Sequence, residues 1–224
     1  MKIYDQNPIP LSDGMQRPDY GVVFIGGFGD KWLGIMHGLW RRFDGFDVPG
    51  SWVSGYYHWD GDGWGLAGDR CDRIAFDLER LLDRFPETHL VLIGHSYGGS
   101  ASMQVARLLQ HDACRLDVLT IDAVSRRQTS DRAQGVGLWI NTYLSRGGGW
   151  LDIVPRIGGR WGECEEADVN LAYDGTICVP GRGLLYSHRD PASMMDESPV
   201  GDASPVEMLA ARVMSGTRQV NEED

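Results

Sequence analysis

The sequence predicts an α/β fold in which a mostly parallel central sheet is flanked by helices. Short apolar, β-branched segments alternate along the chain with longer segments whose apolar residues recur at helical spacing. The segments at residues 21–25 and 89–93 are almost entirely apolar, a pattern typical of strands buried on both faces of a parallel sheet. Because successive parallel strands need crossover connections, the intervening helices are expected to cover this sheet.

The first half of the chain contains two expected strands and two expected helices. The strands are predicted at residues 21–25 and 52–57, and the helices at residues 31–43 and 69–85. The second helix is amphipathic, with apolar side chains spaced among Asp, Glu and Arg, and Pro86 ends it. Together these segments form a strand–helix–strand unit followed by a crossover helix.

The second half continues the alternation and then becomes irregular. Strands are predicted at residues 89–93, 116–121 and 138–144, with a helix between the first two of them. Glycine stretches at residues 147–149 and 158–159 mark long connections, and the sequence does not place the elements between residues 150 and 187. A last helix is expected from Pro205, because Ser204 as N-cap and Glu207 three residues later form a capping-box sequence.

Composition predicts one compact domain spanning residues 1–224, since no break in composition divides the chain. The 21 Lys and Arg against 32 Asp and Glu leave a formal net charge of −11. Such a charge repels phosphate backbones and anionic membranes, so nucleic acid is not expected as a partner. A neutral small-molecule or lipid ester remains compatible with it, and nothing in the sequence indicates the oligomeric state.

The amino-terminal residues lack the apolar run of a secretory signal, and no segment approaches the roughly 20 apolar residues of a membrane span. A cytoplasmic protein is therefore expected. The four cysteines are Cys71, Cys114, Cys164 and Cys178, and no CxxC pair occurs among them. Free thiols are favoured, with a Cys164–Cys178 pair left open for an oxidising compartment.

The segment Gly94-His95-Ser96-Tyr97-Gly98 matches the G-x-S-x-G pattern of a nucleophile elbow. In a chain with 30 glycines the bare pattern is weak evidence, and a glycine-rich packing turn is the alternative. Its context is more specific, because it directly follows a buried strand and opens a helix. We therefore predict that Ser96 is a catalytic nucleophile.

A serine hydroxyl needs a base to take its proton, and imidazole titrates in the right range. The chain order serine, acid, histidine leaves His111 and His188 downstream of Ser96. His111 is expected to end the helix after the elbow and to point away, so His188, in a polar turn before the last helix, is the predicted base. His95 is expected to shape the elbow, because an adjacent residue cannot easily reach round to Ser96.

A carboxylate must orient this imidazole and stabilise its cation. Asp122 follows directly after the strand at residues 116–121, where a carboxylate would be costly to bury without a partner. Asp152, shortly after the next strand, is the competitor. We favour Asp122, with capping of the following turn as its alternative role.

Backbone N–H groups of Phe28 and Tyr97 are the predicted oxyanion-hole donors. Tyr97 follows the nucleophile, and Phe28 lies in the glycine-rich loop at residues 26–29. No Gly-Lys-Ser or Gly-Lys-Thr follows that loop, so nucleotide binding is not expected. The six histidines form no H-x-x-x-H pair, and neither a metal nor an organic cofactor is expected.

On residues 24–30, 91–99, 119–125 and 187–195, the chain resembles the lipase and esterase branch of the α/β-hydrolase superfamily. This resemblance implies the α/β-hydrolase fold and hydrolysis of a carboxylic ester through an acyl-enzyme on Ser96, with Asp122 and His188 completing the triad. The sequence departs from the family where it has Gly26-Gly27, since the corresponding loop usually begins His-Gly. Many relatives place the acid after a later strand, which keeps Asp152 in contention.

Residues 139–143 and 167–170, with His188, are also similar to compact lipase-like proteins that include some bacterial type VI secretion effectors. This similarity implies possible export without a signal peptide and attack on a phospholipid or another ester. Thioester and amide hydrolysis need the same triad, and a non-catalytic binding protein with this fold is the rival from another class. Four residues are candidates for lining an acyl pocket, with core packing as the alternative: Trp32, Leu33, Met36 and Met194.

Overall fold

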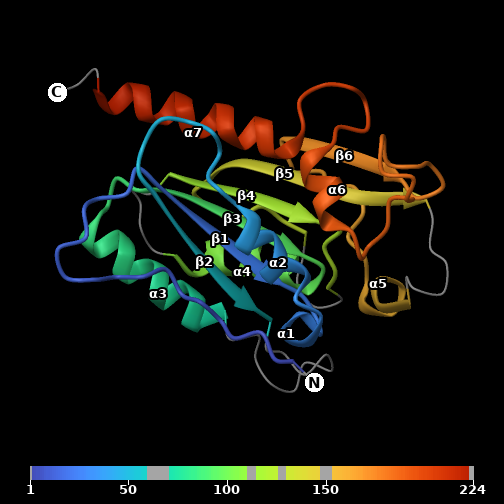
Figure 1. Cartoon of the computed structure of the whole chain (residues 1–224), viewed down its shortest axis with the longest axis horizontal. Coiled ribbons are helices and arrows are strands. Elements are labelled where there is room, and N and C mark those ends of the chain that lie inside the picture. The colour runs from blue at the N-terminus through green and yellow to red at the C-terminus, as the bar shows by residue number, and fades with distance from the viewer. Residues whose placement is uncertain (1, 60–70, 110–114, 126–129, 147–152, 222–224) are drawn as a thin grey trace.

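A computed structural model describes residues 2–59, 71–109, 115–125, 130–146 and 153–221 of the chain (Figure 1). The named strands belong to one six-stranded sheet with the order β2-β1-β3-β4-β5-β6, and every neighbouring pair is parallel. The strands are β1 (Tyr20–Gly26), β2 (Trp52–His58), β3 (His89–His95), β4 (Leu116–Ile121), β5 (Val136–Arg146) and β6 (Val169–Asp174). The predicted α/β class with a parallel central sheet is confirmed.

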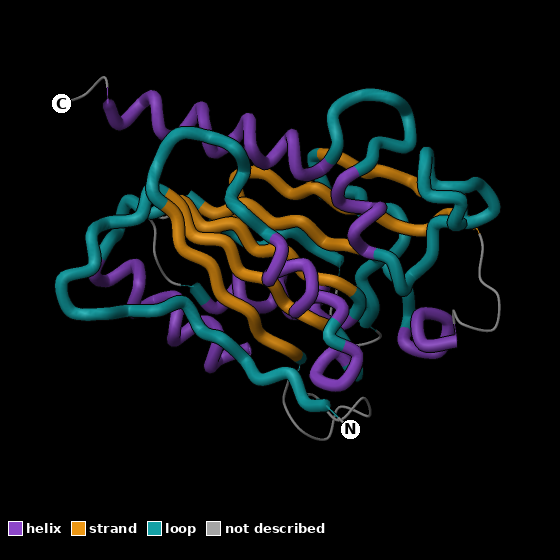
Figure 2. The backbone as a smooth tube through the Cα atoms, in the orientation of Figure 1, coloured by secondary structure: helices purple, strands orange, loops and turns teal. Residues whose placement is uncertain are grey.

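Helices lie on both faces of the sheet (Figure 2). The helices are α1 (Asp30–Leu33), α2 (Ile35–Arg42), α3 (Cys71–Arg84), α4 (Tyr97–Leu108), α5 (Ile153–Gly158), α6 (Pro191–Asp196) and α7 (Pro205–Asn221). Helices α3 and α4 contribute to one hydrophobic core cluster, whereas α2, α6 and α7 contribute to the other. Among the described helices, none is both long enough and apolar enough to cross a membrane.

Strand β1 shows how the sequence builds this three-layer arrangement. Successive side chains of a strand point to opposite faces, so Val23 and Ile25 join the cluster under α3 and α4. Val22 and Phe24 join the cluster under α2, α6 and α7. All seven residues of β1 are buried, which explains why the strand reads as a continuous apolar run rather than as an alternating one.

Two parts of the fold differ from the sequence predictions. The single helix predicted at residues 31–43 is two helices, α1 and α2, separated by Gly34. Gly34 has a φ of 64°, and a Cβ there would lie 2.6 Å from the ring of Tyr4, so the chain turns sharply at this point. The stretch without predicted elements contains α5 and strand β6, which pairs with β5 at the edge of the sheet.

Helix α7 begins at the predicted residue. The backbone N–H of Glu207 donates to Ser204 Oγ over 3.3 Å, and the N–H of Ser204 donates to Glu207 Oε2 over 2.7 Å. These reciprocal hydrogen bonds form the capping box that the sequence predicts, and they satisfy backbone donors at the start of the helix.

The cysteines within the described residues are free thiols: Cys71, Cys164 and Cys178. Cys164 is buried and Cys178 is exposed, so the Cys164–Cys178 pair that the sequence left open is not formed in the structure. Burial raises the pKa of the Cys164 thiol to about 11, which disfavours the reactive thiolate. Cys114 lies outside the described residues.

A buried contact between a histidine and a carboxylate lies at the amino-terminal end of the sheet, away from the strand ends that carry Ser96. His89 Nε2 is 2.8 Å from Asp117 Oδ2, and the backbone N–H of Leu138 donates to Asp117 Oδ1 over 2.8 Å. Asp117→Ala is expected to lower the free energy of unfolding by about 3 kcal/mol, because it leaves buried donors without an acceptor. Urea denaturation measures this loss; Asp202→Ala, at an exposed position, should change stability by less than about 0.5 kcal/mol. Equal stability of the two variants would contradict this structural role.

Candidate active site

Ser96 lies on a strained turn between β3 and α4, with a φ of 58° and a ψ of −129°. The surrounding backbone fixes this conformation, since the Ser96 N–H donates to the Ile121 carbonyl over 3.0 Å. The glycines of the elbow permit close approach of the backbone. A Cβ on Gly98 would lie 2.1 Å from the carbonyl oxygen of Ile25, and one on Gly94 would lie 2.2 Å from that of Gly98. The predicted strand–turn–helix context of Ser96 is present.

The structure brings together the three side chains that the sequence singles out. His188 Nε2 lies 3.0 Å from Ser96 Oγ, and His188 Nδ1 lies 2.6 Å from Asp122 Oδ2. All three residues are buried. With Nδ1–H donating to the carboxylate, Nε2 is the acceptor that faces the serine hydroxyl, which is the tautomer a general base requires. His111 and Asp152, the two alternatives considered for the base and the acid, lie outside the described residues.

Asp122 follows β4 in a left-handed backbone conformation, with a φ of 43°. Burial alone would raise the pKa of its carboxyl group. The hydrogen bond and charge of His188, the charge of Arg160 and the backbone N–H of Leu144 outweigh that effect, so the pKa lies below its usual value. Asp122 is therefore ionised at neutral pH and can stabilise a cation beside it.

Arg160 is a partner of Asp122 that the sequence does not predict. Its Nη2 donates to Asp122 Oδ2 over 2.9 Å, and its Nε forms an ion-pair contact of 2.8 Å with Oδ1. The backbone around Arg160 runs beside the segment that follows Asp122, because Ser125 N donates to Gly159 O and Trp161 N donates to Ala123 O. This pairing joins segments far apart in sequence and leaves no local pattern from which Arg160 could be recognised.

His95 is fully enclosed beside the proposed base. Its Nε2–H donates to the backbone carbonyl of His188 over 2.6 Å, and the two imidazole centroids lie 4.6 Å apart. Burial lowers the pKa of His95 to about 3, so this ring is neutral near physiological pH. The sequence predicts only that His95 shapes the elbow; in the structure it also holds the backbone of the loop that carries His188.

The two predicted oxyanion donors belong to neighbouring turns. Tyr97 is the first residue of α4, where backbone N–H groups point out of the helix end, and Phe28 lies in the turn after β1. Gly27 brings these turns together, since a Cβ on it would lie 2.6 Å from Ser96 Cβ and 3.0 Å from the backbone nitrogen of Tyr97. Trp59 stacks on Tyr97 at 4.5 Å and meets Phe28 edge-on at 6.2 Å.

Asp30 fixes the other side of the loop after β1. The Tyr56 hydroxyl donates to its Oδ2 over 2.5 Å, and the N–H groups of Ile35 and Met36 donate to its Oδ1 over 2.8 and 3.1 Å. The carboxylate is buried, so these contacts replace its lost hydration. Sequence reasoning missed Asp30, although a carboxylate directly after a glycine-rich loop is a visible signal.

No protein-family model matches the sequence, and no curated protein matches it either. Solved structures do match. Carboxyl esterase 2 from the mycorrhizal fungus Tuber melanosporum aligns with a TM-score of 0.51 at 9% identity, covering 96% of this chain and 88% of its own. The chain has the α/β-hydrolase fold.

Two bacterial structures of this fold align less closely. An alpha-beta serine hydrolase homologue from Coxiella burnetii has a TM-score of 0.48 at 11% identity, covering 93% of this chain and 88% of its own. A serine hydrolase described as lacking a lid, from Xanthomonas campestris, has a TM-score of 0.44 at 15% identity, covering 95% and 86%.

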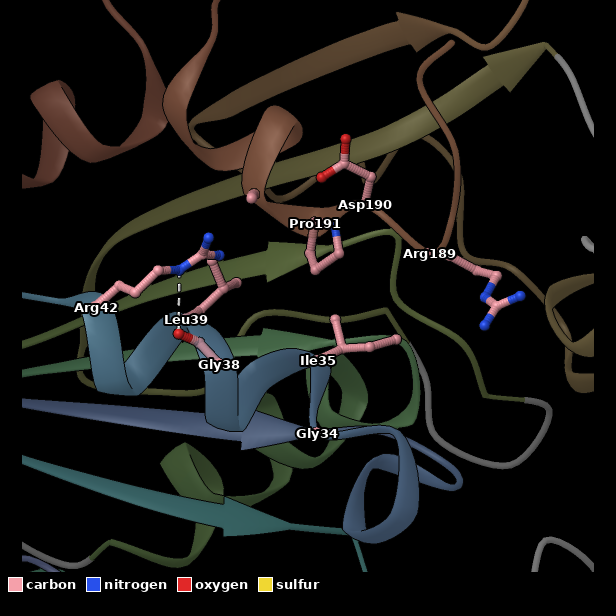
Figure 3. Close-up of a pocket in the computed structure, with 9 residues that line it drawn as sticks. Gly34, Ile35, Gly38, Leu39, Arg42, Arg189, Asp190 and Pro191 are labelled. Carbon is pink, nitrogen blue, oxygen red and sulfur yellow. Dashed lines mark hydrogen bonds between the residues drawn. The ribbon is translucent and has the colours of Figure 1, made fainter. Parts of the chain in front are cut away.

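A groove of about 490 Å³ lies between α2 and the start of α6, next to the residue that follows His188 (Figure 3). Its walls combine apolar side chains with charged groups at the rim, and the Arg42 Nε–H donates to the Gly38 carbonyl over 3.2 Å. The lining residues are Gly34, Ile35, Gly38, Leu39, Arg42, Arg189, Asp190, Pro191 and Ala192. In this α/β-hydrolase fold, the groove offers space beside the loop that carries His188.

The candidates for lining an acyl pocket divide into two pairs. Met36 and Met194 have no exposed surface and pack in the core between the sheet and its helices, so the core-packing interpretation holds for both. Trp32 and Leu33 are 42% and 53% exposed on α1, at the end of the sheet toward which the strand arrows of Figure 1 point. Of these four candidates, only Trp32 and Leu33 on α1 are available to contact a substrate.

Proposed function

We propose that the protein is a serine hydrolase that cleaves carboxylic esters through an acyl-enzyme on Ser96, with residues 1–224 acting as one domain. The observation that carries the proposal is the buried hydrogen-bond chain from Ser96 Oγ through His188 to Asp122, with steps of 3.0 and 2.6 Å. Base and nucleophile are thus within the reach that proton transfer requires. A His188 beyond hydrogen-bond reach of Ser96 would favour a binding protein that has lost its chemistry. The distance of 3.0 Å between His188 Nε2 and Ser96 Oγ does not favour that alternative.

In the first half-reaction, His188 Nε2 takes the hydroxyl proton of Ser96 as Oγ attacks the carbonyl carbon of the ester. The N–H groups of Phe28 and Tyr97 donate to the resulting oxyanion, and the ionised Asp122 stabilises the imidazolium. Collapse of the tetrahedral intermediate breaks the bond to the alkoxide, which takes the proton from His188 and leaves as an alcohol. The acyl group stays on Ser96.

In the second half-reaction, His188 Nε2 takes a proton from water as the water oxygen attacks the acyl carbonyl carbon. Collapse of the second tetrahedral intermediate returns the proton to Ser96 Oγ and releases the carboxylic acid. These two half-reactions need no metal ion and no organic cofactor. The groove between α2 and α6 would hold a non-reacting part of the substrate, with Ile35 and Leu39 on its apolar wall.

A fluorophosphonate probe and p-nitrophenyl esters of graded acyl length test this function. We expect the wild-type protein to be labelled and to hydrolyse the esters, and Ser96→Ala to do neither. A matched thioester and anilide, assayed beside the preferred ester, distinguish an esterase from a thioesterase or an amidase. An unlabelled wild-type protein that also releases no p-nitrophenol would contradict the proposal.

The oxyanion assignment predicts a strong effect for Gly27→Ala. The added Cβ would press on Ser96 and on the backbone nitrogen of Tyr97, so the turn must shift and misplace at least one donor. We expect fluorophosphonate labelling to slow by about 100-fold, the cost of losing one oxyanion-hole donor. Gly21→Ala is the control, because Gly21 lies at the other end of β1 and the atoms nearest its added Cβ would belong to the side chains of Leu90, Ile9 and Leu81. Labelling of Gly27→Ala at the rate of this control would overturn the assignment.

A further inference from the structure

The carboxylate of Asp122 accepts hydrogen bonds from two side chains, the imidazole of His188 and the guanidinium of Arg160. Its Oδ2 accepts hydrogen bonds from His188 Nδ1 over 2.6 Å and from Arg160 Nη2 over 2.9 Å. Its Oδ1 accepts from the backbone N–H of Leu144 over 3.2 Å and lies 2.8 Å from Arg160 Nε. Asp122 is fully buried, so protein groups rather than bulk water supply this environment.

A permanent guanidinium charge beside Asp122 changes what the carboxylate can do for His188. The negative charge of Asp122 favours protonation of the imidazole, because it stabilises the cation. The positive charge of Arg160 opposes this effect through the same carboxylate, and it also repels the imidazolium directly. The side chain of Arg160 is only 20% exposed, so water screens these interactions weakly.

We propose that Arg160 is a positioning residue that lowers the proton affinity of His188 through their shared partner, Asp122, and thereby sets the lower pH limit of the reaction. The inference rests on the proposed function of Ser96 and His188. With Arg160 in place, the acidic limb of the activity profile lies at a lower pH than for a triad whose acid contacts the imidazole alone.

Within the part of the chain that the structure describes, the other charged and titratable groups around His188 do not provide this effect. His95 contacts the His188 carbonyl but is neutral over the working range, because burial lowers its pKa to about 3. Arg189 and Asp190 follow His188 in its own loop with opposite charges, and Asp190 is engaged by Ser193 at the start of α6. These groups are unchanged when only Arg160 is replaced.

The test compares pH profiles of kcat/KM for the wild type, Arg160→Gln and Arg160→Lys. We expect Arg160→Gln to move the midpoint of the acidic limb upward by about one pH unit, so that activity well below the midpoint falls about tenfold. Arg160→Lys keeps the charge and should leave the midpoint near that of the wild type. The control is Arg132→Gln, because Arg132 anchors Asp168 and the start of β5 through its own contacts and does not touch Asp122.

An NMR titration of the His188 imidazole gives a second readout that does not depend on turnover. A higher pKa of His188 in Arg160→Gln would support the coupling even if no ester were hydrolysed, so failure of the inference and failure of the proposed function are distinguishable. A purely structural Arg160 would lower the rate at every pH while leaving both the midpoint and the pKa of His188 unchanged, and that result would overturn the inference. Arg160→Met, which keeps the aliphatic part of the side chain, replaces the glutamine variant if the latter does not fold.

Discussion

Ser96→Ala is expected to lower kcat for ester hydrolysis by about 10⁵- to 10⁶-fold. The substitution removes the oxygen that forms the acyl-enzyme, and the 3.0 Å hydrogen bond between Ser96 Oγ and His188 Nε2 disappears with it. The elbow itself should survive, because its conformation is fixed by backbone contacts such as Ser96 N to Ile121 O. Steady-state hydrolysis of a p-nitrophenyl ester and circular dichroism of the same sample measure the two effects.

Two further serine variants make this result specific. Ser96→Gly should also be inactive, yet it should gain about 1 kcal/mol in unfolding free energy, because glycine adopts the strained φ of 58° at little cost. Ser100→Ala is the control in the same helix, since within the described residues Ser100 Oγ donates to the carbonyls of Tyr97 and Val124. It should lose about 1 kcal/mol of stability and keep its activity. More than a tenth of wild-type activity in Ser96→Ala would contradict the assigned nucleophile.

The sheet could be predicted because the signal for each central strand is local. Strands β1, β3 and β4 are buried on both faces, so each is a short, largely apolar run without regular polar alternation. Strand β6 lies at the edge of the sheet, and only Leu171 and Tyr173 are buried among its six residues. Such a short, half-exposed strand within a glycine-rich stretch carries little signal, and it was missed for that reason.

The hydrogen-bonded group of Ser96, His188 and Asp122 could be anticipated from chain order and sheet topology. Parallel neighbours β3 and β4 end at the same edge, so Ser96 after β3 and Asp122 after β4 must lie close together. His188 follows from the need for a base late in the chain. Arg160 could not be anticipated, because its contact with Asp122 depends on the path of a segment whose sequence shows no periodicity.

Asp122→Asn is expected to lower kcat by about 10⁴-fold while leaving Ser96 and His188 in place. An asparagine amide facing His188 Nδ1 would donate rather than accept, which favours the tautomer with the proton on Nε2. That tautomer cannot take the proton of Ser96, so the loss appears in kcat with little change in KM. Asp168→Asn is the matched control, since Asp168 accepts hydrogen bonds from Arg132 and Trp139 rather than from Ser96, His188 or Arg160.

The stability of Asp122→Asn distinguishes the role of Arg160 from that of His188. Without the carboxylate, the guanidinium of Arg160 loses its counter-charge in a largely buried position, and we expect the free energy of unfolding to fall by about 2 kcal/mol. Removing that charge as well, in Asp122→Asn with Arg160→Gln, should restore part of the stability without restoring turnover. Urea denaturation and kcat measured on both variants test this expectation. If the double variant were no more stable than Asp122→Asn, the lost stability would not come from the uncompensated charge of Arg160. If its activity recovered, the lost turnover would not come from the wrong tautomer of His188.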